Sequence, residues 1–483
     1  MTSTPRSSDL IAALAAIVGA KQVLTTAADT APYLSDWRGR YRGAARCVVR
    51  PANTAEVAAV VRACAAAGVP MLPQGGNTSL CGAATPDTGG DAVLISLARL
   101  KRIFTVDAEN DTICVGAGCT LAEVQAAARA AGRLFPLALA SEGSCQIGGN
   151  LSTNAGGVQV LRYGNTRELT LGLEVVLPDG EVWNGLRGLR KDNTGYDLKQ
   201  CFIGAEGTLG IITAAVLKLF PLPQRQSTCW LNVADPAAAV VLLQAAKNAF
   251  NAQLTAFELI SEVALGLVLQ HIPGTRRPVA ASPWYVLAEF SDAAPEAVEG
   301  WLAEQIAAGR VADGVLAQSE REAQALWALR ENISEAQKIE GVSIKHDIAV
   351  PVSAIPEFLR RADGALAAAF PGIRVVAFGH VGDGNLHYNL SKADAQNNAA
   401  FLAAQPQVNR IVHDTVDALS GSISAEHGIG QLKIGELQHY KAPLELAMMR
   451  RLKAAFDPQG LMNPGKLLAP SVPPSSLTSP DET

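Results

Sequence analysis

Two histidines separated by six residues are the clearest chemical signal in this chain of 483 residues, which has only seven histidines. They are His380 and His387, in the segment HVGDGNLH, which lies between two apolar runs. If residues 382–385 form the loop of a hairpin, His380 faces His387 across the two strands. Both imidazoles then reach one divalent cation, and Asn389 points to the same face. Two surface histidines beside a glycine-rich turn are the alternative.

The segment SAEHGIG at 424–430 adds a carboxylate and a further imidazole on a glycine-rich backbone. Glu426 is a candidate third ligand, because two histidines and one carboxylate leave coordination positions open for a substrate. Zn²⁺ or another divalent ion suits this set. His427 is the candidate general base, since an imidazole with a pKa of about 6.5 accepts a proton near neutral pH. A metal hydrolase could use the same groups.

Basic and hydroxyl side chains upstream of these histidines could bind an acidic substrate. The segment WALRENISEA at 327–336 predicts one helix, with Arg330 and Ser334 on one face. The segment at 342–348 predicts a strand that carries Lys345. Arginine offers a carboxylate a bidentate fork and lysine a point charge. For each of these residues alone, a solvated surface position is the simpler interpretation.

Two glycine-rich segments could bind an anion through the main chain. One is PQGGNTSL at 73–80, after an apolar run, and the other is SEGSCQIGGN at 141–150, which continues through STNAGG at 152–157. Successive glycines let main-chain N–H groups converge on a phosphate. Neither segment is a Walker motif or a Rossmann fingerprint. Tight turns without a ligand are the alternative, but a third such segment, GAEGTLGII at 204–212, favours a cradle.

The elements around these residues predict an α+β fold in five parts. A helical segment at 1–46 precedes a part of short strands, helices and glycine turns at 47–223. Residues 224–394 alternate strands with covering helices, which predicts an antiparallel sheet covered by helices. Residues 395–470 are mainly helical and complete the active site. The Pro/Ser-rich tail at 471–483 is expected to be disordered.

Composition excludes several classes of protein. Lys and Arg number 40 against 45 Asp and Glu, so a nucleic-acid partner is not expected. The longest candidate membrane segment, residues 10–20, is much shorter than the roughly 20 residues of a span. The eight cysteines include no CxxC pair, which is typical of reduced thiols in a cytoplasmic protein.

The glycine-rich segments together resemble the FAD-binding domain of the vanillyl-alcohol oxidase / p-cresol methylhydroxylase flavoproteins, over residues 40–222. The resemblance implies a two-part FAD-binding domain whose loops hold the FAD pyrophosphate. Some relatives attach FAD covalently through a His or Cys in the first loop, where this chain has Asn77, so non-covalent FAD is expected. The implied flavin contacts are Pro73, Gln74, Gly75, Gly76, Asn77, Thr78, Ser79, Glu142, Gly148, Gly149, Asn150, Thr153, Asn154, Gly156, Gly157, Val158, Glu206, Gly210 and Ile211.

The HxGDGNxH and EHGIG elements resemble the FAD-linked oxidase C-terminal domain of D-2-hydroxy-acid dehydrogenases, which extends the resemblance to residues 30–468. It implies that His380, His387 and Glu426 bind the metal and that His427 is the catalytic base.

The pattern WxLRExIxEA followed by K-x-D is similar to that of the D-2-hydroxyglutarate dehydrogenases in particular. In that group the residues equivalent to Arg330, Ser334 and Lys345 bind the far carboxylate of the substrate, and Ser334 stands where some members have Thr. We also expect Asn389 to contact the substrate. The resemblance implies oxidation of D-2-hydroxyglutarate to 2-oxoglutarate by hydride transfer to FAD.

Several alternatives stay open at this point. They are a D-lactate or glycolate dehydrogenase, D-malate as the substrate, and a flavin-bearing electron carrier without its own substrate. The chain has no NAD fingerprint and no cysteine cluster for iron–sulfur, so we expect an external electron acceptor such as an electron-transfer flavoprotein or a quinone. A homodimer stays open as well.

Overall fold

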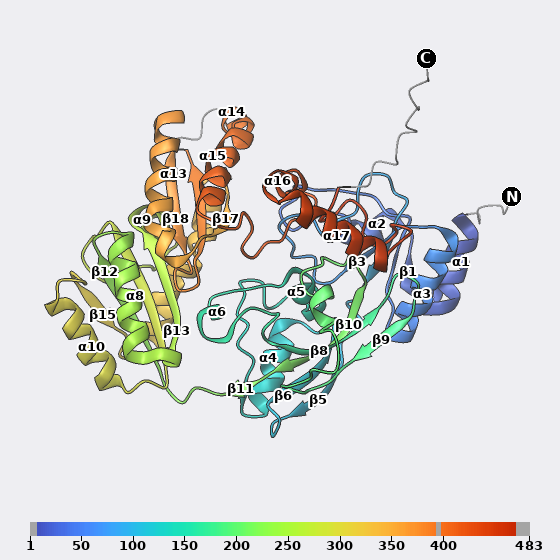
Figure 1. The fold of residues 1–483 in the computed structure, drawn as a ribbon, viewed down its shortest axis with the longest axis horizontal. Helices are drawn as coiled ribbons and strands as arrows, with labels where there is room; N and C mark the ends of the chain where they lie inside the picture. Colours follow the sequence, from blue (N-terminus) through green and yellow to red (C-terminus); the bar gives the residue numbers. More distant parts are fainter. Residues whose placement is uncertain (1–6, 393–397, 470–483) are drawn as a thin grey trace, which may run out of the picture.

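The computed structural model describes residues 7–392 and 398–469. Figure 1 shows two lobes, the first coloured blue to green and the second lime to orange, with the last helices in red returning to the first lobe. The predicted tail at 471–483 lies outside the described residues. Within these residues no helix is both long and apolar enough to cross a membrane. All eight cysteines are described, and each is a free thiol.

A four-stranded sheet with its helices forms the outer part of the first lobe. Its elements are α1 (Ser7–Val18), β1 (Val23–Leu24), α2 (Ala27–Thr30), β2 (Cys47–Val49), α3 (Thr54–Ala67), β3 (Met71–Gln74) and β4 (Val93–Ser96). The order is β1-β2-β4-β3, and β2, β4 and β3 run parallel. Helix α3 begins after Asn53, whose side chain accepts a hydrogen bond from Glu56 N, and ends at Gly68 with φ 64°. The first glycine-rich loop follows β3.

A five-stranded antiparallel sheet forms the rest of the first lobe. The elements are β5 (Ile103–Asp107), β6 (Thr112–Gly116), α4 (Leu121–Ala130), β7 (Arg133–Leu134), α5 (Ile147–Thr153), α6 (Val160–Tyr163), β8 (Thr170–Val176), β9 (Val182–Gly185), α7 (Lys199–Phe202), β10 (Ile211–Lys218) and β11 (Phe220–Pro221). The sheet runs in the order β5-β6-β10-β8-β9. The two sheets confirm the predicted two-part architecture of this lobe.

The second lobe is built on one sheet of eight strands. Its elements are β12 (Gln226–Val233), α8 (Pro236–Phe250), β13 (Leu254–Ser261), α9 (Glu262–His271), β14 (Trp284–Ser291), α10 (Pro295–Ala307), β15 (Gly314–Leu316), α11 (Glu320–Glu331), α12 (Ile333–Glu340), β16 (Ser343–Ile344), β17 (Asp347–Ala349), α13 (Ile355–Ala369), β18 (Arg374–Gly379) and β19 (Asn385–Ser391). The order is β15-β12-β14-β13-β18-β19-β16, and β17 also pairs with β19. The predicted antiparallel sheet covered by helices is confirmed.

The two faces of this sheet belong to different cores. One face, which includes Phe257 and Tyr388, packs against α8, α10, α13 and α15 (Gln405–Ala418). The other face, which includes Phe378, packs against α9, α11 and α12. Because side chains alternate along a strand, Glu258 and His387 lie on this second face, under α11 and α12. The polar groups of the candidate site therefore gather on one side of the sheet.

The C-terminal helices bring the chain back to the first lobe (Figure 1). After α14 (Asn398–Ala403) and α15, an irregular stretch at 419–433 leads to α16 (Ile434–Tyr440) and α17 (Pro443–Phe456). Lys453 in α17 donates to Thr208 O at 2.7 Å, and the Asn463 amide donates to Glu206 O at 2.8 Å. The segments that follow the stretch at 419–433 are thus hydrogen-bonded to the first lobe. That stretch contains Glu426 and His427.

Two elements differ from the predicted ones. The helix expected over 327–336 is broken at Asn332, because the Asn332 amide donates to Ala328 O at 2.8 Å and competes with the continuing helix. The strand expected over 342–348 forms as two short strands, β16 and β17, which pair with β19 in one register; between them Tyr388 N donates to His346 O at 3.0 Å, while His346 N donates to the Asn389 side chain at 3.2 Å. Strand β13, in the middle of the sheet, is not among the predicted strands.

Candidate active site

The two glycine-rich loops lie against one another. A Cβ atom on Gly76 would lie 2.0 Å from Ser144 O, so only glycine fits there. A Cβ atom on Gly75 would lie 3.5 Å from Gly149 N. Gly148 in turn packs on Ala117, where a Cβ would approach the Ala117 Cβ to 2.8 Å. The backbones of the two loops therefore meet at 75–76 and 144–149.

Several donors at this meeting point have no protein acceptor. Within the described residues, the main-chain N–H groups of 75–80 and of Gly149 donate to no other group. The Gln146 side-chain oxygen, beside Gly75, is buried and also without a partner. A cluster of free N–H groups on glycine backbone suits a ligand with several phosphate oxygens. The loops therefore fit the pyrophosphate of FAD.

Some side chains predicted as flavin contacts hold the loops in place instead. The Gln74 amide donates to main-chain oxygens at 2.8 and 2.9 Å, and the Asn77 amide does so at 2.8 Å. Asn154 Oδ1 accepts from a main-chain N–H at 2.9 Å, and the Thr153 hydroxyl donates to Gly149 O at 3.0 Å. Of these four residues, only Asn77 belongs to the run 75–80 whose main-chain N–H groups are left for a flavin, and the contact roles of all four stay predictions.

The other predicted flavin contacts occupy different surroundings. Gly210 and Ile211 lead into β10, where the Ile211 side chain is buried in the core. Glu142 accepts a hydrogen bond from Gln125 Nε2 at 3.3 Å. Val158 is half-buried and follows the 152–157 segment. Their contacts with a flavin stay predictions.

The three predicted metal ligands come together. Candidate ligand atoms of His380, His387 and Glu426 all lie within 4.8 Å of one another. The centres of the two imidazole rings are 5.7 Å apart, and His387 Nε2 is 3.8 Å from a Glu426 carboxylate oxygen. Two imidazoles and one carboxylate are a donor set that zinc and several other divalent ions accept. The residues therefore fit a metal ion.

The predicted pairing of the two histidines was wrong in its register. Phe378, not His380, pairs with His387, and β18 ends at Gly379. Gly379 with φ 157° and the turn at 380–384 take His380 out of the strand. If the strand pairing continued past Gly379, His380 would lie diagonally across from His387 on the same face of the sheet. Two imidazole rings can span that separation. The prediction that both side chains lie on the same face of the sheet was right, so the two rings still lie close together.

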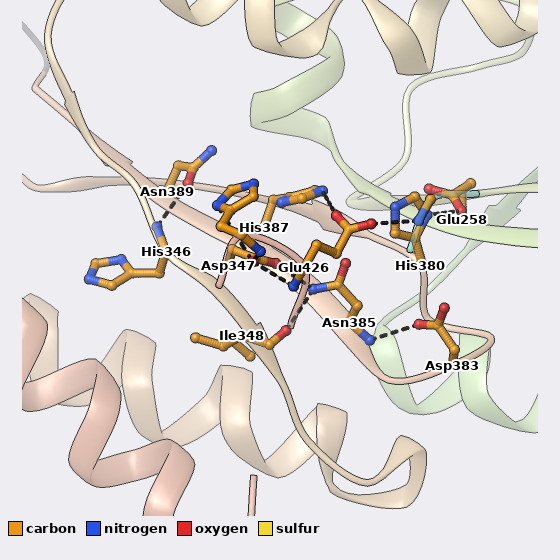
Figure 2. A network of polar contacts seen from close by, with 12 residues as sticks. Glu258, His346, Asp347, Ile348, His380, Asp383, Asn385, His387, Asn389 and Glu426 are labelled. Carbon is orange, nitrogen blue, oxygen red and sulfur yellow. Dashed lines mark hydrogen bonds and ion pairs between the residues drawn. The ribbon is translucent and has the colours of Figure 1, made fainter. Parts of the chain in front are cut away.

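Glu258 lies behind His380. Its carboxylate accepts from His380 Nδ1 at 2.6 Å (Figure 2). It also accepts from Arg330 Nε at 2.7 Å, and the Glu258 side chain is fully buried. Burial alone would raise the pKa of Glu258, but His380 and Arg330 lower it to about 2. Burial opposes the charged form of His380, yet Glu258 raises the pKa of His380 to about 9. Because Nδ1 faces Glu258, Nε2 of His380 is the atom available to a metal.

Glu426 and Glu206 join the two lobes at the site. Glu426 Oε1 accepts from Gly157 N at 2.6 Å, so a metal-ligand candidate touches the second glycine-rich loop. Glu206 accepts from Ile429 N at 2.6 Å and Gly430 N at 2.7 Å. Glu206 was predicted as a flavin contact, but its two carboxylate oxygens hold the backbone after His427. These bonds fix the 424–430 segment against the first lobe.

Asp347 supports the candidate base. Its Oδ2 accepts from the main-chain N–H groups of Glu426 and His427, both at 2.9 Å, and lies 3.5 Å from His427 Nδ1. Burial would raise the pKa of Asp347, but the charges of His427 and Lys433 hold it well below the ordinary value. Burial lowers the pKa of His427. Burial therefore favours the neutral imidazole of His427, whose Nδ1 lies beside the Asp347 carboxylate.

The residues predicted to bind the far carboxylate differ in exposure. Arg330 is buried and lies over the Phe378 ring at 4.8 Å, while Ser334, beyond the break between α11 and α12, is exposed. Burial and, to a smaller extent, the charges of Arg38 and Arg40 together lower the pKa of Lys345 to about 8. The Asn389 amide donates to Gln337 at 2.9 Å. The structure thus places Arg330 beside the metal ligands through Glu258, and the substrate roles of all four residues stay predictions.

Sequence reasoning missed two carboxylates that organise the site, Glu258 and Asp347. Glu258 is the only charged residue in the apolar segment LTAFELIS of β13, and a lone acid in a buried strand is a signal that could have found it. Asp347 lies two residues after Lys345, on the strand side that meets His427, and its partners come from residues 426 and 427.

Two family models match the chain. Residues 45–185 match the one described as FAD binding domain, and residues 222–467 match the one described as FAD linked oxidases, C-terminal domain. Among solved structures, p-cresol methylhydroxylase with substrate bound superposes with a TM-score of 0.76 at 16% identity, covering 96% of this chain and 97% of that one. 4-Ethylphenol oxidase from Gulosibacter chungangensis gives 0.70 at 18% identity, covering 96% and 98%. These structures confirm the predicted fold, whereas the boundaries of the five parts stay predictions.

Full-length relatives are much more similar in sequence. A D-2-hydroxyglutarate dehydrogenase of Xanthomonas citri pv. viticola is 41% identical over 471 residues, covering 97% of this chain and 98% of the relative. One from Stutzerimonas stutzeri is 38% identical over 463 residues, covering 95% and 99%. A mitochondrial one from Bos taurus is 39% identical over 468 residues, covering 96% and 84%. The chain therefore belongs to the FAD-linked oxidases of the vanillyl-alcohol oxidase / p-cresol methylhydroxylase type, in the family of the D-2-hydroxyglutarate dehydrogenases.

Proposed function

We propose that this protein oxidises D-2-hydroxyglutarate to 2-oxoglutarate, with FAD as the hydride acceptor and a divalent metal ion, zinc being the first candidate, held by His380, His387 and Glu426. The observation that carries the proposal is that these three ligand candidates and His427 converge where the second lobe meets the glycine-rich cradle. Relatives named D-2-hydroxyglutarate dehydrogenases, 38–41% identical over nearly the whole chain, support the substrate. Asn77 in the first loop supports non-covalent FAD.

The reaction divides into a hydride and a proton. When bound, FAD supplies the hydride acceptor and the metal a positive charge that lowers the pKa of the substrate hydroxyl. The substrate loses a hydride from its Cα and the proton of its hydroxyl, and the C–O bond becomes the carbonyl of the 2-oxo acid. His427 accepts that proton on Nε2, because Nδ1 faces Asp347. The carboxylate of Asp347 stabilises the resulting imidazolium.

Two basic side chains, those of Arg330 and Lys345, support a dicarboxylate as the substrate. The Glu258 carboxylate holds Arg330 through Nε, which leaves the two terminal nitrogens of the guanidinium for a substrate carboxylate. Lys345, with a pKa of about 8, is mostly charged at neutral pH. We place the far carboxylate at Arg330 and Lys345, with Ser334 and Asn389 as further candidate contacts. Binding energy at this end would orient the reacting end of the substrate.

Anaerobic reduction of the flavin tests the proposal. The yellow absorbance of the FAD-loaded protein should bleach with D-2-hydroxyglutarate but not with its L-isomer, and more slowly with D-malate, D-lactate or glycolate. His427→Ala should slow the bleaching by about 10²–10⁴-fold, whereas His439→Ala, at an exposed position of α16, should not. If no 2-hydroxy acid reduces the flavin, the alternative of a flavin-bearing electron carrier without its own substrate is favoured. Equal rates with D-lactate and D-2-hydroxyglutarate would contradict the dicarboxylate preference.

The reduced flavin then needs an external acceptor. We propose an electron-transfer flavoprotein or a quinone, and reoxidation by each, followed after anaerobic bleaching, separates the two. The eight free thiols support a cytoplasmic location, since a reducing compartment preserves them.

A further inference from the structure

Glu258 connects two groups that the proposed mechanism treats separately. One carboxylate oxygen accepts from His380 Nδ1 at 2.6 Å, and the other accepts from Arg330 Nε at 2.7 Å. The Glu258 side chain has no exposed surface. The same carboxylate therefore touches a metal-ligand candidate and the candidate for binding the far carboxylate of the substrate.

The position of Glu258 follows from the sheet. β13 lies between β14 and β18, so a side chain on its second face lies under α11, which carries Arg330. His380 follows the end of β18, which pairs with β13 through Ile260 and Phe378. A carboxylate here is 72 residues from Arg330 and 122 from His380 in the sequence. Only the sheet brings the three together.

A second contact path joins the same groups. The Arg330 guanidinium lies over the Phe378 ring at 4.8 Å, and that ring packs against the His387 ring at 5.0 Å between centroids. Arg330 thus contacts the surroundings of both metal-ligand histidines, one through Glu258 and one through Phe378.

Each hydrogen bond fixes an orientation. With Nδ1 donating to Glu258, His380 has Nε2 as the atom left for a metal, as in a carboxylate–histidine–metal arrangement. With Nε donating to Glu258, Arg330 cannot turn its terminal nitrogens towards the core, so these remain for a ligand. The buried charge of Glu258 is tolerated because both oxygens have charged or polar donors.

We propose that Glu258 is a positioning residue with two roles. It orients His380 so that Nε2 faces the metal, and it orients Arg330 so that the terminal guanidinium nitrogens face the far carboxylate of the substrate. The inference rests on the proposed function, because it assumes a metal at His380 and a substrate carboxylate at Arg330. It extends that function by making metal affinity and dicarboxylate recognition depend on one side chain that touches neither the metal nor the substrate.

The substitution Glu258→Gln isolates this role. Glutamine has the shape of glutamate, but it offers one acceptor oxygen and one NH₂ donor. If its oxygen faces Arg330 Nε, its NH₂ faces His380 Nδ1 and drives the proton to Nε2, where it blocks the metal. If its oxygen faces His380, two donors meet at Arg330 and the guanidinium must move. Glutamine can therefore satisfy only one of the two partners.

Glu289→Gln is the matched control. Glu289 lies on β14, the neighbouring strand, and its buried carboxylate accepts from Trp327 Nε1 at 2.9 Å, a residue of the same helix as Arg330. Glutamine keeps this bond through its oxygen and donates through its NH₂ to the Thr255 hydroxyl, which lies 3.3 Å from the other carboxylate oxygen. The control therefore makes the same chemical change on the same sheet without touching His380 or Arg330.

The experiment uses FAD-loaded full-length protein and two readouts. The first is the Kd for Zn²⁺, from competition with a chromophoric chelator without substrate. The second is the KM for D-2-hydroxyglutarate against that for D-lactate, which has no far carboxylate. For Glu258→Gln we expect a 10–100-fold weaker Zn²⁺ Kd, or a KM that rises roughly tenfold for D-2-hydroxyglutarate only, or both. Glu289→Gln should stay within about twofold of wild type in each.

The outcomes separate the inference from the proposed function. If wild type binds Zn²⁺ and prefers D-2-hydroxyglutarate, but Glu258→Gln leaves both readouts unchanged, the role of Glu258 is refuted and the proposed function stands. If wild type binds no divalent ion more tightly than His387→Ala does, the metal of the proposed function fails, and the inference fails with it. If Glu258→Gln does not fold, Glu258→Asp, which keeps two acceptor oxygens on a shorter chain, is compared with Glu289→Asp. Equal Zn²⁺ Kd and KM values in that pair then refute the inference.

Discussion

Replacing Asp347 by asparagine removes one negative charge from beside His427 with little change of shape. Asp347 Oδ2 accepts from two main-chain N–H groups at 2.9 Å and lies 3.5 Å from His427 Nδ1. The other oxygen accepts from the Asn385 amide at 2.9 Å. Asparagine can keep the two main-chain bonds through its oxygen, so the 424–430 segment should stay in place while His427 loses its anionic partner.

The size of the effect follows from the geometry. Two unit charges 3.5 Å apart attract by about 5 kcal/mol at an effective dielectric constant of about 20. The dipole of the asparagine amide retains part of this attraction, and a hydrogen bond to a charged group contributes about 1.5–3 kcal/mol. We therefore expect a loss of about 2–4 kcal/mol when His427 becomes protonated in the transition state. This loss corresponds to a roughly 30- to 1,000-fold slower reaction.

The assay is stopped-flow reduction of the flavin under anaerobic conditions, at saturating D-2-hydroxyglutarate. The rate should fall in Asp347→Asn while the FAD content stays that of wild type. Asp363→Asn is the control, because Asp363 accepts from the Tyr388 hydroxyl at 2.6 Å on the opposite face of the sheet. A reduction rate for Asp347→Asn within threefold of wild type would show that the Asp347 charge does not support the base.

Three further outcomes are expected. Dialysis against a chelator should abolish flavin reduction by the substrate, and added Zn²⁺ should restore it. Zn²⁺ should not restore flavin reduction in His387→Ala. Full activity at zero metal content would exclude a metal from the reaction. The KM for D-2-hydroxyglutarate should rise above pH 8, because the pKa of Lys345 is lowered to about 8 and its charge is lost there. Lys345→Arg should flatten this rise. An equal rise in the KM for D-lactate would contradict the assignment of Lys345 to the far carboxylate. Gly76→Ala should purify with less FAD, because its Cβ would lie 2.0 Å from Ser144 O, whereas Gly143→Ala, with no atom within 4 Å, should retain FAD as wild type does.

Much of the candidate site could be predicted from local pattern. The spacing of His380 and His387 within a hairpin places both on one sheet face in the predicted register and in the observed one, because the two registers differ by two residues and side chains alternate along a strand. The adjacent Glu426 and His427 on a glycine-rich backbone were recognised from residue type. The glycine-rich loops indicated a cradle because consecutive glycines expose main-chain donors.

Pairing and helix continuity were harder to predict. The register between β18 and β19 places Phe378 opposite His387 and ends β18 at Gly379, which nothing in the spacing of the histidines reveals. At the break between α11 and α12 the Asn332 side chain bonds to Ala328 O, and Ser334, beyond the break, is exposed. Such local competition between side chain and backbone is decided by the surrounding packing.

Residue types and their spacing along the chain were enough to predict an anion cradle on the main chain, a set of metal ligands and a base. These depend on residue types a few positions apart, where chain geometry limits the arrangements. The tertiary structure alone decided which carboxylates orient them. Glu258 reaches His380 across 122 residues, and Asp347 reaches His427 across 80. Contacts of this range depend on the order of strands in the sheet and on the return of the chain between the lobes, and no local pattern contains either.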